Sequence, residues 1–283
     1  MKAERSLPKR RLFLLFKVSS SGYYDWLKRQ PSNRMVHNIA LDERIQRIYD
    51  EHAGRYGYRR ICDVLRDEDF SVSLERVRRR MKRLGLQGIQ KRKFKHTTDS
   101  KHNLPTAPNL LNQCFDADAP NTKWVADITY IRVKQQWLYL AVVVDLYSRK
   151  VIGWAFGERI NARLVCDALK AALFKRSRPS GVIVHTDRGS QYCSQAYQRL
   201  IKAYDLKCSM SGKGNCYDNA ACESFFHTLK VEYVYRVAFE SIEHARREIF
   251  WFIEAYYNLK RKHSKLGYQS PVKFESAALK IAA

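Results

Sequence analysis

Three acidic residues of this chain have the surroundings expected of metal ligands. Asp127 interrupts the apolar segment WVADITYIRV, Asp187 ends the segment GVIVHTD, and Glu223 lies in DNAACESFFHTLK, with 35 residues between the last two. Aspartate is a poor strand former, and a charge within a strand is costly unless it is paired or metal-bound. Each residue alone would more often be a cap or a solvated side chain. Together they predict a site for hard cations such as Mg²⁺, where two ions about 3.5–4 Å apart can promote phosphoryl transfer.

The local elements explain how these acids could share one site. Asp187 follows an apolar run at the carboxyl end of an expected parallel strand, where open α/β sheets place their ligands. If the strand carrying Asp127 is its neighbour, the two carboxylates meet at one edge of the sheet. On a helix, Asn219, Glu223, His227 and Lys230 fall in one polar stripe. The opposite stripe is expected to be buried and consists of Cys222, Phe225, Phe226, Leu229 and Tyr233. We therefore expect Lys230 to contact phosphate beside the metals.

The overall charge indicates a polyanionic partner. The chain of 283 residues has 52 Lys and Arg against 28 Asp and Glu, a formal charge of +24. Its composition is 45% hydrophobic and 12% aromatic, which excludes a disordered polycation. Such a field attracts nucleic acid with strong salt dependence. Anionic membranes or ribosomal RNA would suit the charge equally well, so charge alone does not choose the partner.

Cysteine usage and hydropathy bear on the compartment. The seven cysteines are an odd number, scattered, and include no C-x-x-C pair, which is typical of reduced thiols in a cytosolic protein. The apolar run LFLLF near the start is too short for a signal peptide, and no segment approaches the length of a membrane span. We expect a cytoplasmic protein without a membrane partner.

Residues 1–95 are expected to form a basic, helical DNA-binding region with helix-turn-helix-like segments. In SLERVRRRMKRLGL, an apolar stripe is flanked by cations, a pattern that suits a helix lying on DNA. The expected stripe is Leu74, Val77, Met81 and Leu84. The expected DNA contacts are Arg76, Arg79, Arg80 and Arg83. A solvated face on a small bundle explains this helix equally well, and the nearby run KRKFKH favours DNA.

The remainder of the chain divides into three segments that differ in composition and periodicity. Residues 96–121 contain three prolines and lack periodicity, so they are interpreted as a linker. Residues 122–240 have the element order βββαβαβα, which predicts an α/β fold: a mixed five-stranded sheet with flanking helices. Residues 241–283 are expected to form a C-terminal helix and a basic tail, with Lys260 and Arg261 as further DNA contacts.

Several polar residues near the acids are given structural roles. Asp145 precedes a turn and is interpreted as a hairpin cap, Asp218 is expected to cap the helix of Glu223, and His185 is expected to pack. A zinc site is not favoured, because the spacing of Cys216, Cys222 and His227 fits no usual ligand pattern.

The tryptophans of the strands are expected to serve the core. Most aromatic residues of this region lie on apolar strands, which suits a packed interior better than a surface that stacks on nucleobases. The residues concerned are Trp124, Trp137 and Trp154.

Motifs along nearly the whole chain resemble a known family. The stretches WVADITYI, VVVDLYSRKVIGW, HTDRGSQY, SGKGNCYDNAACESFFHTLK and YYNLKRKHSKLGYQSP are similar to DDE transposases of the retroviral-integrase superfamily. More narrowly, they resemble the OrfB-type proteins of bacterial insertion sequences of family three. SGYYDWLKR and the YGYRRI region resemble the N-terminal part of that family.

The resemblance implies a ribonuclease-H-like fold and a specific chemistry. It implies Asp127, Asp187 and Glu223 as ligands of Mg²⁺ or Mn²⁺, with Lys230 as a contact to DNA near the element's end. The implied reaction is hydrolytic nicking of DNA that frees a 3′-OH, followed by attack of that hydroxyl on another phosphodiester. This is DNA strand cleavage and strand transfer during transposition, carried out on the bacterial nucleoid.

The resemblance also implies partners. The partners would be terminal inverted repeats and target DNA, bound by a homo-oligomer. Members of the family usually join an upstream-frame helix-turn-helix and leucine-zipper protein through frameshifting, and no sustained heptad repeat is present here. A catalytically silent DNA-binding regulator of transposition is the alternative function, and a nuclease without joining activity is a third. The intact set of three acids argues against the silent regulator.

Overall fold

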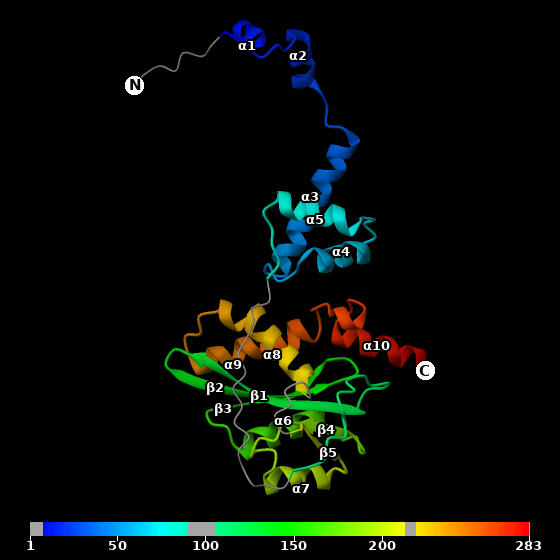
Figure 1. Ribbon diagram of the computed structural model, residues 1–283, viewed down its shortest axis with the longest axis vertical. Helices are drawn as coiled ribbons and strands as arrows, with labels where there is room; N and C mark the ends of the chain where they lie inside the picture. Colours follow the sequence, from blue (N-terminus) through cyan, green and yellow to red (C-terminus); the bar gives the residue numbers. More distant parts are fainter. Residues whose placement is uncertain (1–7, 90–105, 213–218, 283) are drawn as a thin grey trace. The chain divides into compact units, whose positions relative to one another are not determined.

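The computed structural model describes residues 8–89, 106–212 and 219–282, and the chain divides into two compact units, residues 1–88 and 89–283. Five helices of the first unit are labelled in Figure 1: α1 Lys9–Leu15, α2 Ser20–Lys28, α3 Asn33–Glu51, α4 Tyr58–Asp67 and α5 Leu74–Arg83. Within the described residues, none of the helices combines the length and the apolar character needed to cross a membrane.

Helices α3, α4 and α5 form a small bundle around one apolar core. Ile45 of α3, Ile61 of α4 and Val77 of α5 are all fully buried in it. Ser73 begins α5 by accepting a hydrogen bond from the backbone N–H of Arg76, as expected of an N-cap. Leu74 is 41% exposed, so its predicted place in the buried stripe is wrong. The cause is its position in the first turn, before α5 reaches the bundle core.

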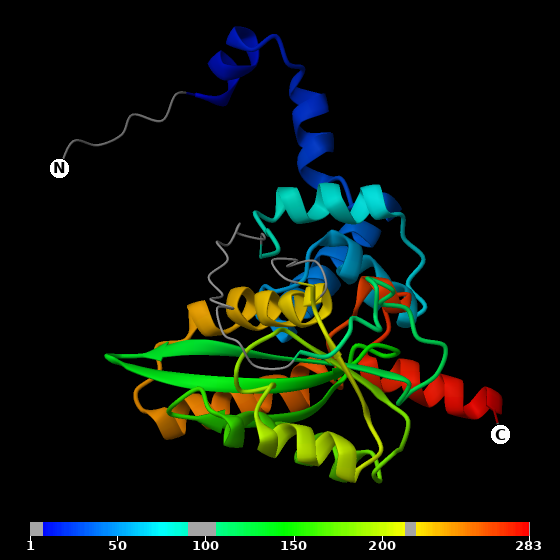
Figure 2. The ribbon, with the colours of Figure 1, turned by 60° about the horizontal axis from the view of Figure 1, so that its bottom comes forward.

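The second unit contains a five-stranded mixed sheet, which confirms the predicted α/β fold. Its strands are β1 Lys123–Val133, β2 Gln136–Asp145, β3 Val151–Gly157, β4 Ile183–Thr186 and β5 Lys207–Met210, in the order β3-β2-β1-β4-β5. β1 is antiparallel to β2 and parallel to β4, and β4 is parallel to β5. Figure 2 shows β1 and β2 running side by side as a long hairpin.

Helices cover both faces of this sheet. Figure 1 shows α8 (Ala220–Glu232) and α9 (Ile242–Trp251) on one side, with α6 (Ala162–Lys175) and α7 (Gln195–Ala203) on the other. The strands serve two apolar clusters because successive side chains alternate between faces. In β1, Val125 and Ile131 pack in the cluster of α8 and α9, whereas Trp124 and Ala126 pack in the cluster of α6 and α7.

Two regions that the sequence separates from the sheet pack into the same unit. Leu111, within the expected linker, is 1% exposed and belongs to the cluster of α8 and α9, and Leu110 N–H donates to Ser209 Oγ at 2.8 Å. The C-terminal segment contributes Ile249 and Phe252 to that cluster. In the linker, residues 96–105 lie outside the described residues. The apolar side chains of these flanking segments thus complete the core of the sheet.

The chain after α9 closes over the turn between β2 and β3. A π-helical turn, Phe252–Tyr257, leads through a 3₁₀ turn, Ser264–Leu266, to α10, Pro271–Ala282. The Glu275 carboxylate on α10 accepts hydrogen bonds from Ser148 Oγ at 2.5 Å and Lys150 Nζ at 2.9 Å, and it also pairs with Arg176. A shorter 3₁₀ turn, Val234–Arg236, follows α8.

Candidate active site

The pairing of β1 with β4 brings two of the predicted acids together. Val125 is paired with His185 in parallel register, and two residues beyond this pair lie Asp127, on β1, and Asp187, the first residue after β4. Side chains at matching positions of parallel strands point to the same face, here the face covered by α8. The Asp187 carboxylate accepts the Gly189 backbone N–H at 2.9 Å, which fixes the turn after β4.

Helix α8 supplies the third acid and a cation. Its predicted buried stripe is confirmed, since Cys222 and Leu229 are fully buried in the cluster beneath the helix. Glu223 and Lys230 are half-buried on the stripe that faces the cleft. Asn219 departs from the predicted polar stripe because it is 6% exposed and its amide donates to the Ala126 carbonyl at 3.4 Å.

The side chains of Asp127, Asp187, Glu223 and Lys230 line one open cleft of about 820 Å³. The cleft lies between the edge of β1, the end of β4 and the length of α8. It is lined on the chemical side by Asp127, Asp187, Glu223, His227 and Lys230, and further along β1 and β2 by Tyr130, Arg132 and Trp137. The acids and an aromatic surface thus share one cavity.

The electrostatics of the cleft concentrate negative charge. Burial raises the pKa of Asp127 well above its ordinary value, and the nearby charges of Asp187 and Glu223 raise it further. A hydrogen bond of 2.7 Å from the Ile128 backbone N–H opposes that rise. Burial lowers the pKa of Lys230, whose charge is favoured by Asp127. These carboxylates repel one another unless a cation compensates them.

The chemistry of the donor set fits a hard divalent cation. The acids offer carboxylate oxygens, and their mutual repulsion in a half-buried cleft would be relieved by a divalent charge. Among the residues that the structure describes, no group of three or more acidic, histidine or cysteine side chains is arranged to hold a metal ion. Mg²⁺ itself takes one or two carboxylates and completes its shell with water and substrate phosphates.

Two buried polar residues, at the ends of β2 and β4, have the structural roles predicted for them. His185 is fully buried, with its Nδ1 2.8 Å from Ser209 Oγ and its Nε2 3.2 Å from Ser211 Oγ, so it packs as predicted. Asp145 is also fully buried and accepts the Tyr147 N–H at 3.0 Å, which confirms its role at the turn after β2. Asp218 and Cys216 lie outside the described residues.

One tryptophan contradicts the expected core role. Trp124 is fully buried and Trp154 is half-buried against Phe156, but Trp137 is 43% exposed in the cleft. The reason is position: Trp137 lies near the start of β2, on the face served by α6 and α7 but beyond the part of the sheet that those helices cover. Tyr130 beside it is 46% exposed. The apolar residues at the end of a strand do not show how far a helix from elsewhere in the chain extends over it.

Comparison with known proteins identifies the family. Models of the integrase core domain match residues 117–216 and 204–271, and a model described as an HTH-like domain matches residues 37–94. The transposase InsF of insertion sequence IS3A from Escherichia coli is 45% identical over 94% of this chain and 93% of its own length. The chain belongs to the IS3 family of insertion-sequence transposases.

One further relative and one solved structure are also similar to this chain. A 31 kDa protein of insertion element IS600 from Shigella sonnei is 44% identical to this transposase over 95% of the chain and 99% of its own length. Among solved structures, the catalytic core domain of HTLV-2 integrase in complex with magnesium matches 56% of this chain and 98% of that chain. That match has 19% identity and a TM-score of 0.44.

The family gives the reaction. This transposase is a DDE polynucleotidyl transferase that cleaves DNA strands and transfers them at the ends of an insertion sequence, in a metal-dependent reaction. Its HTH-like domain and its formal charge of +24 are those of a DNA-binding protein.

The predicted DNA-contacting arginines of α5 separate into two groups. Arg79 and Arg83 are exposed, as contacts to phosphate require. Arg80 instead points inward, with its Nε donating to Asp42 Oδ1 at 2.6 Å, and Arg76 Nη2 donates to Asn38 Oδ1 at 3.0 Å. These two fix α5 to α3, so Arg80 is corrected to a structural residue.

The basic tail contains a similar correction. Lys260 is exposed, but Arg261 is 5% exposed and forms a bidentate pair with Glu232, at 2.8 and 2.6 Å. Its guanidinium is buried beside Tyr257 and cannot reach a phosphate. Arg261 therefore anchors the end of the π-helical turn to α8 rather than binding DNA.

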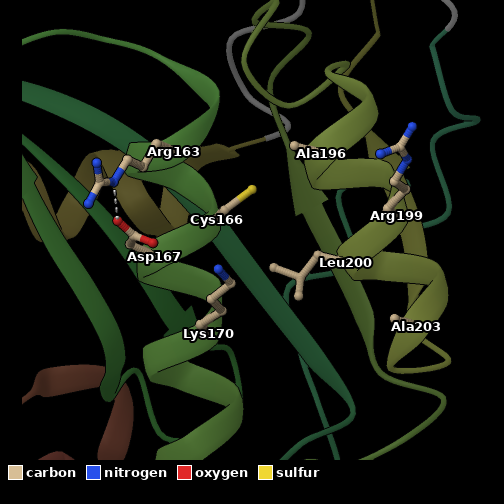
Figure 3. A pocket seen from close by; sticks show the side chains of 8 residues that line it. All are labelled: Arg163, Cys166, Asp167, Lys170, Ala196, Arg199, Leu200 and Ala203. Carbon is tan, nitrogen blue, oxygen red and sulfur yellow. Dashed lines mark ion pairs between the residues drawn. The ribbon is translucent and has the colours of Figure 1, made fainter.

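A second hollow of the transposase lacks the means for metal chemistry. It lies between α6 and α7, has a volume of about 460 Å³, and is lined by the residues drawn in Figure 3, where Cys166 and Leu200 point toward one another. Its one acidic lining residue is Asp167, whose Oδ2 lies 3.6 Å from Nε of Arg163. The cleft of Asp127, which contains three carboxylates, is the candidate active site.

Proposed function

We propose that Asp127, Asp187 and Glu223 are the catalytic carboxylates of this transposase and hold two Mg²⁺ or Mn²⁺ ions. The observation that carries this proposal is their shared cleft, to which two neighbouring strands and a helix each contribute one acid. When bound, the ions supply activation of the attacking oxygen and stabilisation of the leaving oxygen in an in-line displacement. The three side chains would hold these ions beside the phosphodiester, and their negative charge attracts cations to the cleft.

Lys230 is proposed to contact the DNA phosphate beside these acids. It lies two turns after Glu223 on α8 and lines the same cleft. Its pKa is lowered by burial, but Asp127 favours the charged form, so an ammonium is available for a phosphate oxygen. An exposed lysine elsewhere would be more mobile and would compete less well for one phosphate.

The partners and setting follow from the family. We propose that the HTH-like region, through Arg79 and Arg83, and the tail, through Lys260, hold terminal inverted repeats and target DNA on the bacterial nucleoid. A homo-oligomer would bring two element ends together. An upstream-frame protein with a helix-turn-helix and zipper would supply the end recognition and the pairing interface that this chain does not display as a heptad repeat.

The decisive experiment neutralises each acid in turn. Asp127→Asn, Asp187→Asn and Glu223→Gln should each reduce Mn²⁺-dependent cleavage of terminal-repeat DNA by at least roughly 10²–10³-fold. DNA binding should remain near wild type, because no cation is removed. Asp205→Asn is the matched control, since Asp205 is exposed and lies outside the cleft. A variant that retains cleavage would remove its residue from the catalytic set.

Two further readouts separate the competing functions. A precleaved DNA end should be joined to a target, whereas a nuclease without strand transfer gives no joined product. A silent regulator would bind DNA with strong salt dependence and cleave nothing, with or without the upstream-frame protein.

A further inference from the structure

The cleft of the acids continues into an exposed aromatic pair. Tyr130 on β1 and Trp137 on β2 are 46% and 43% exposed, and their ring centroids are 5.2 Å apart in an edge-to-face arrangement. Both line the cavity that contains Asp127 and Glu223. Tyr235, 56% exposed, lines it from the other side. Large aromatic surfaces left in solvent inside a cleft mark a binding surface.

The strand pattern shows that this exposure is not required by the fold. The neighbours Thr129 and Ile131 are buried and supply the packing of β1, as Leu138 does for β2. Tyr130 is paired directly with Tyr139, so Trp137 is its diagonal neighbour on the same face. A polar residue at either position would leave the two apolar clusters intact, because neither ring belongs to them.

Two cations flank the aromatic pair. Lys230 Nζ lies 4.6 Å from the centroid of the Tyr130 ring, and the guanidinium of Arg132 lies 5.7 Å from the centroid of the Trp137 ring. Arg132 is exposed on the same strand, two residues beyond Tyr130. Aromatic faces interleaved with cations are the combination that binds unpaired nucleic-acid strands, with bases on the rings and phosphates on the cations.

The distance to the acids relates this surface to the reaction. Tyr130 is three residues after Asp127 on β1, about 10 Å along the strand, and the two side chains leave the strand on opposite faces. Both line the same cleft, because in the described residues β1 pairs with β4 only over Lys123–Val125 and the cleft follows the edge of β1 beyond that pairing. A base on the rings would therefore lie across this edge from a phosphate held at the acids. Inside a duplex the faces of a base are covered by its stacked neighbours, so only an unpaired base could use the rings.

We propose that Tyr130 and Trp137 form a stacking surface for unpaired nucleobases at the DNA end, with Arg132 and Lys230 on the adjoining phosphates. This inference rests on the proposed function, because it assumes that the DNA end lies at the three acids. The surface holds the strand end after its base pairs open and thereby orients the neighbouring phosphodiester. Stacking on rings tolerates any base, so the pair acts as a positioning device rather than a reader of sequence.

The test compares DNA ends that differ only in their bases. The probe is a fluorescent terminal-repeat duplex with unpaired nucleotides at its end, and its partner carries abasic sites at the same nucleotides. Binding to the full chain is measured by anisotropy without divalent metal. Wild type should bind the base-bearing end roughly 10-fold more tightly than the abasic end, the order of magnitude of one base stack.

Side-chain variants then assign that preference. Tyr130→Ala and Trp137→Ala should each remove most of it by weakening only the base-bearing complex, whereas Tyr130→Phe and Trp137→Phe should retain it. Trp251→Ala is the matched control, because Trp251 is equally exposed at 43% but lies outside the cleft. If the alanine variants weaken both DNAs equally, or wild type does not distinguish them, the stacking surface is refuted.

The two proposals fail in different ways. Cleavage retained by the acid variants would refute the catalytic assignment and leave the metal-free binding difference untouched. Loss of cleavage in those variants, with no binding difference between base-bearing and abasic ends, would refute only the stacking surface.

Discussion

Asp127 on β1 and Asp187, the first residue after β4, are brought to one cleft by the parallel pairing of β1 with β4. The last pair of that register is Val125 with His185, and each acid lies two residues beyond it. Burial and the charge of Asp187 together raise the pKa of Asp127. The free protein therefore keeps like charges close together, which favours cation binding at the expense of stability.

The first prediction concerns that cost. Asp127→Asn should stabilise the metal-free second unit by roughly 1 kcal/mol, because the amide keeps the shape and removes a buried, repelled charge. Urea unfolding followed by tryptophan fluorescence would measure it, because four of the five tryptophans lie in the second unit. A variant less stable than wild type in metal-free buffer would show that the repulsion is already relieved by the protein.

The second prediction concerns metal binding without turnover. Mg²⁺ should raise the stability of wild type by RT ln(1 + [L]/Kd), about 2.7 kcal/mol at a hundredfold excess over Kd. Asp127→Asn should respond much less, whereas the exposed Asp205→Asn should respond like wild type. Thermal unfolding at increasing MgCl₂ measures the effect. Equal responses of Asp127→Asn and wild type would place the cation elsewhere.

The third prediction concerns the pH dependence of the anchor of α10. Burial by itself raises the pKa of Glu275, but hydrogen bonds from Arg176, Ser148 and Lys150 outweigh it and lower the pKa overall. A lowered folded-state pKa means that the carboxylate stabilises the fold above its unfolded pKa, about 4.3. This stability is lost as the pH falls through the folded-state pKa.

Glu275→Gln should therefore cost about 2 kcal/mol at pH 7, since Lys150 loses its acidic partner and Arg176 keeps only its pair with Asp145. The difference from wild type should shrink as the pH falls below the unfolded pKa, about 4.3, and should be lost below the lowered folded-state pKa, where the wild-type carboxyl is also protonated. Denaturant unfolding at a series of pH values measures this, and a difference independent of pH would point to packing rather than charge.

The fourth prediction separates two arginines of α5. Arg83→Ala should weaken DNA binding and reduce the salt slope by about 0.9, the value for one phosphate contact. Arg80→Ala should instead destabilise the first unit, because Asp42 then loses its partner in a part-buried pair. Fluorescence titrations at several salt concentrations, with circular dichroism as the stability readout, distinguish the two. An unchanged slope for Arg83→Ala would remove it from the interface.

Much of the fold followed from short-range pattern. The period of α8 separates Glu223 and Lys230 from the buried residues Cys222 and Leu229, and this separation was predictable because side-chain direction on a helix depends on spacing alone. The order of strands and helices was predictable for the same reason. The partial failure at Leu74 arises at a helix start, where periodicity says nothing about how far the packed neighbours extend.

Burial of long cationic side chains was not predictable in this way. Arg80 and Arg83 lie in the same basic run of α5, and the run itself does not distinguish them. In the structure, Arg80 pairs with Asp42 of α3, whereas Arg83 is exposed. Arg261, in the basic tail, is buried and paired with Glu232 of α8. An arginine becomes structural when a distant carboxylate reaches it, and the local sequence does not contain that information.

The sequence by itself determined the chemistry available to this protein: acidic ligands, a cationic surface and the elements that carry them. Only the tertiary structure decided that β1 lies beside β4, which brings Asp127 and Asp187 into one cleft. It also decided that the helices stop short of Trp137 and leave the ring in the cleft. The physical reason is that periodicity is set by neighbours along the chain, whereas register and burial are set by side chains packing across it.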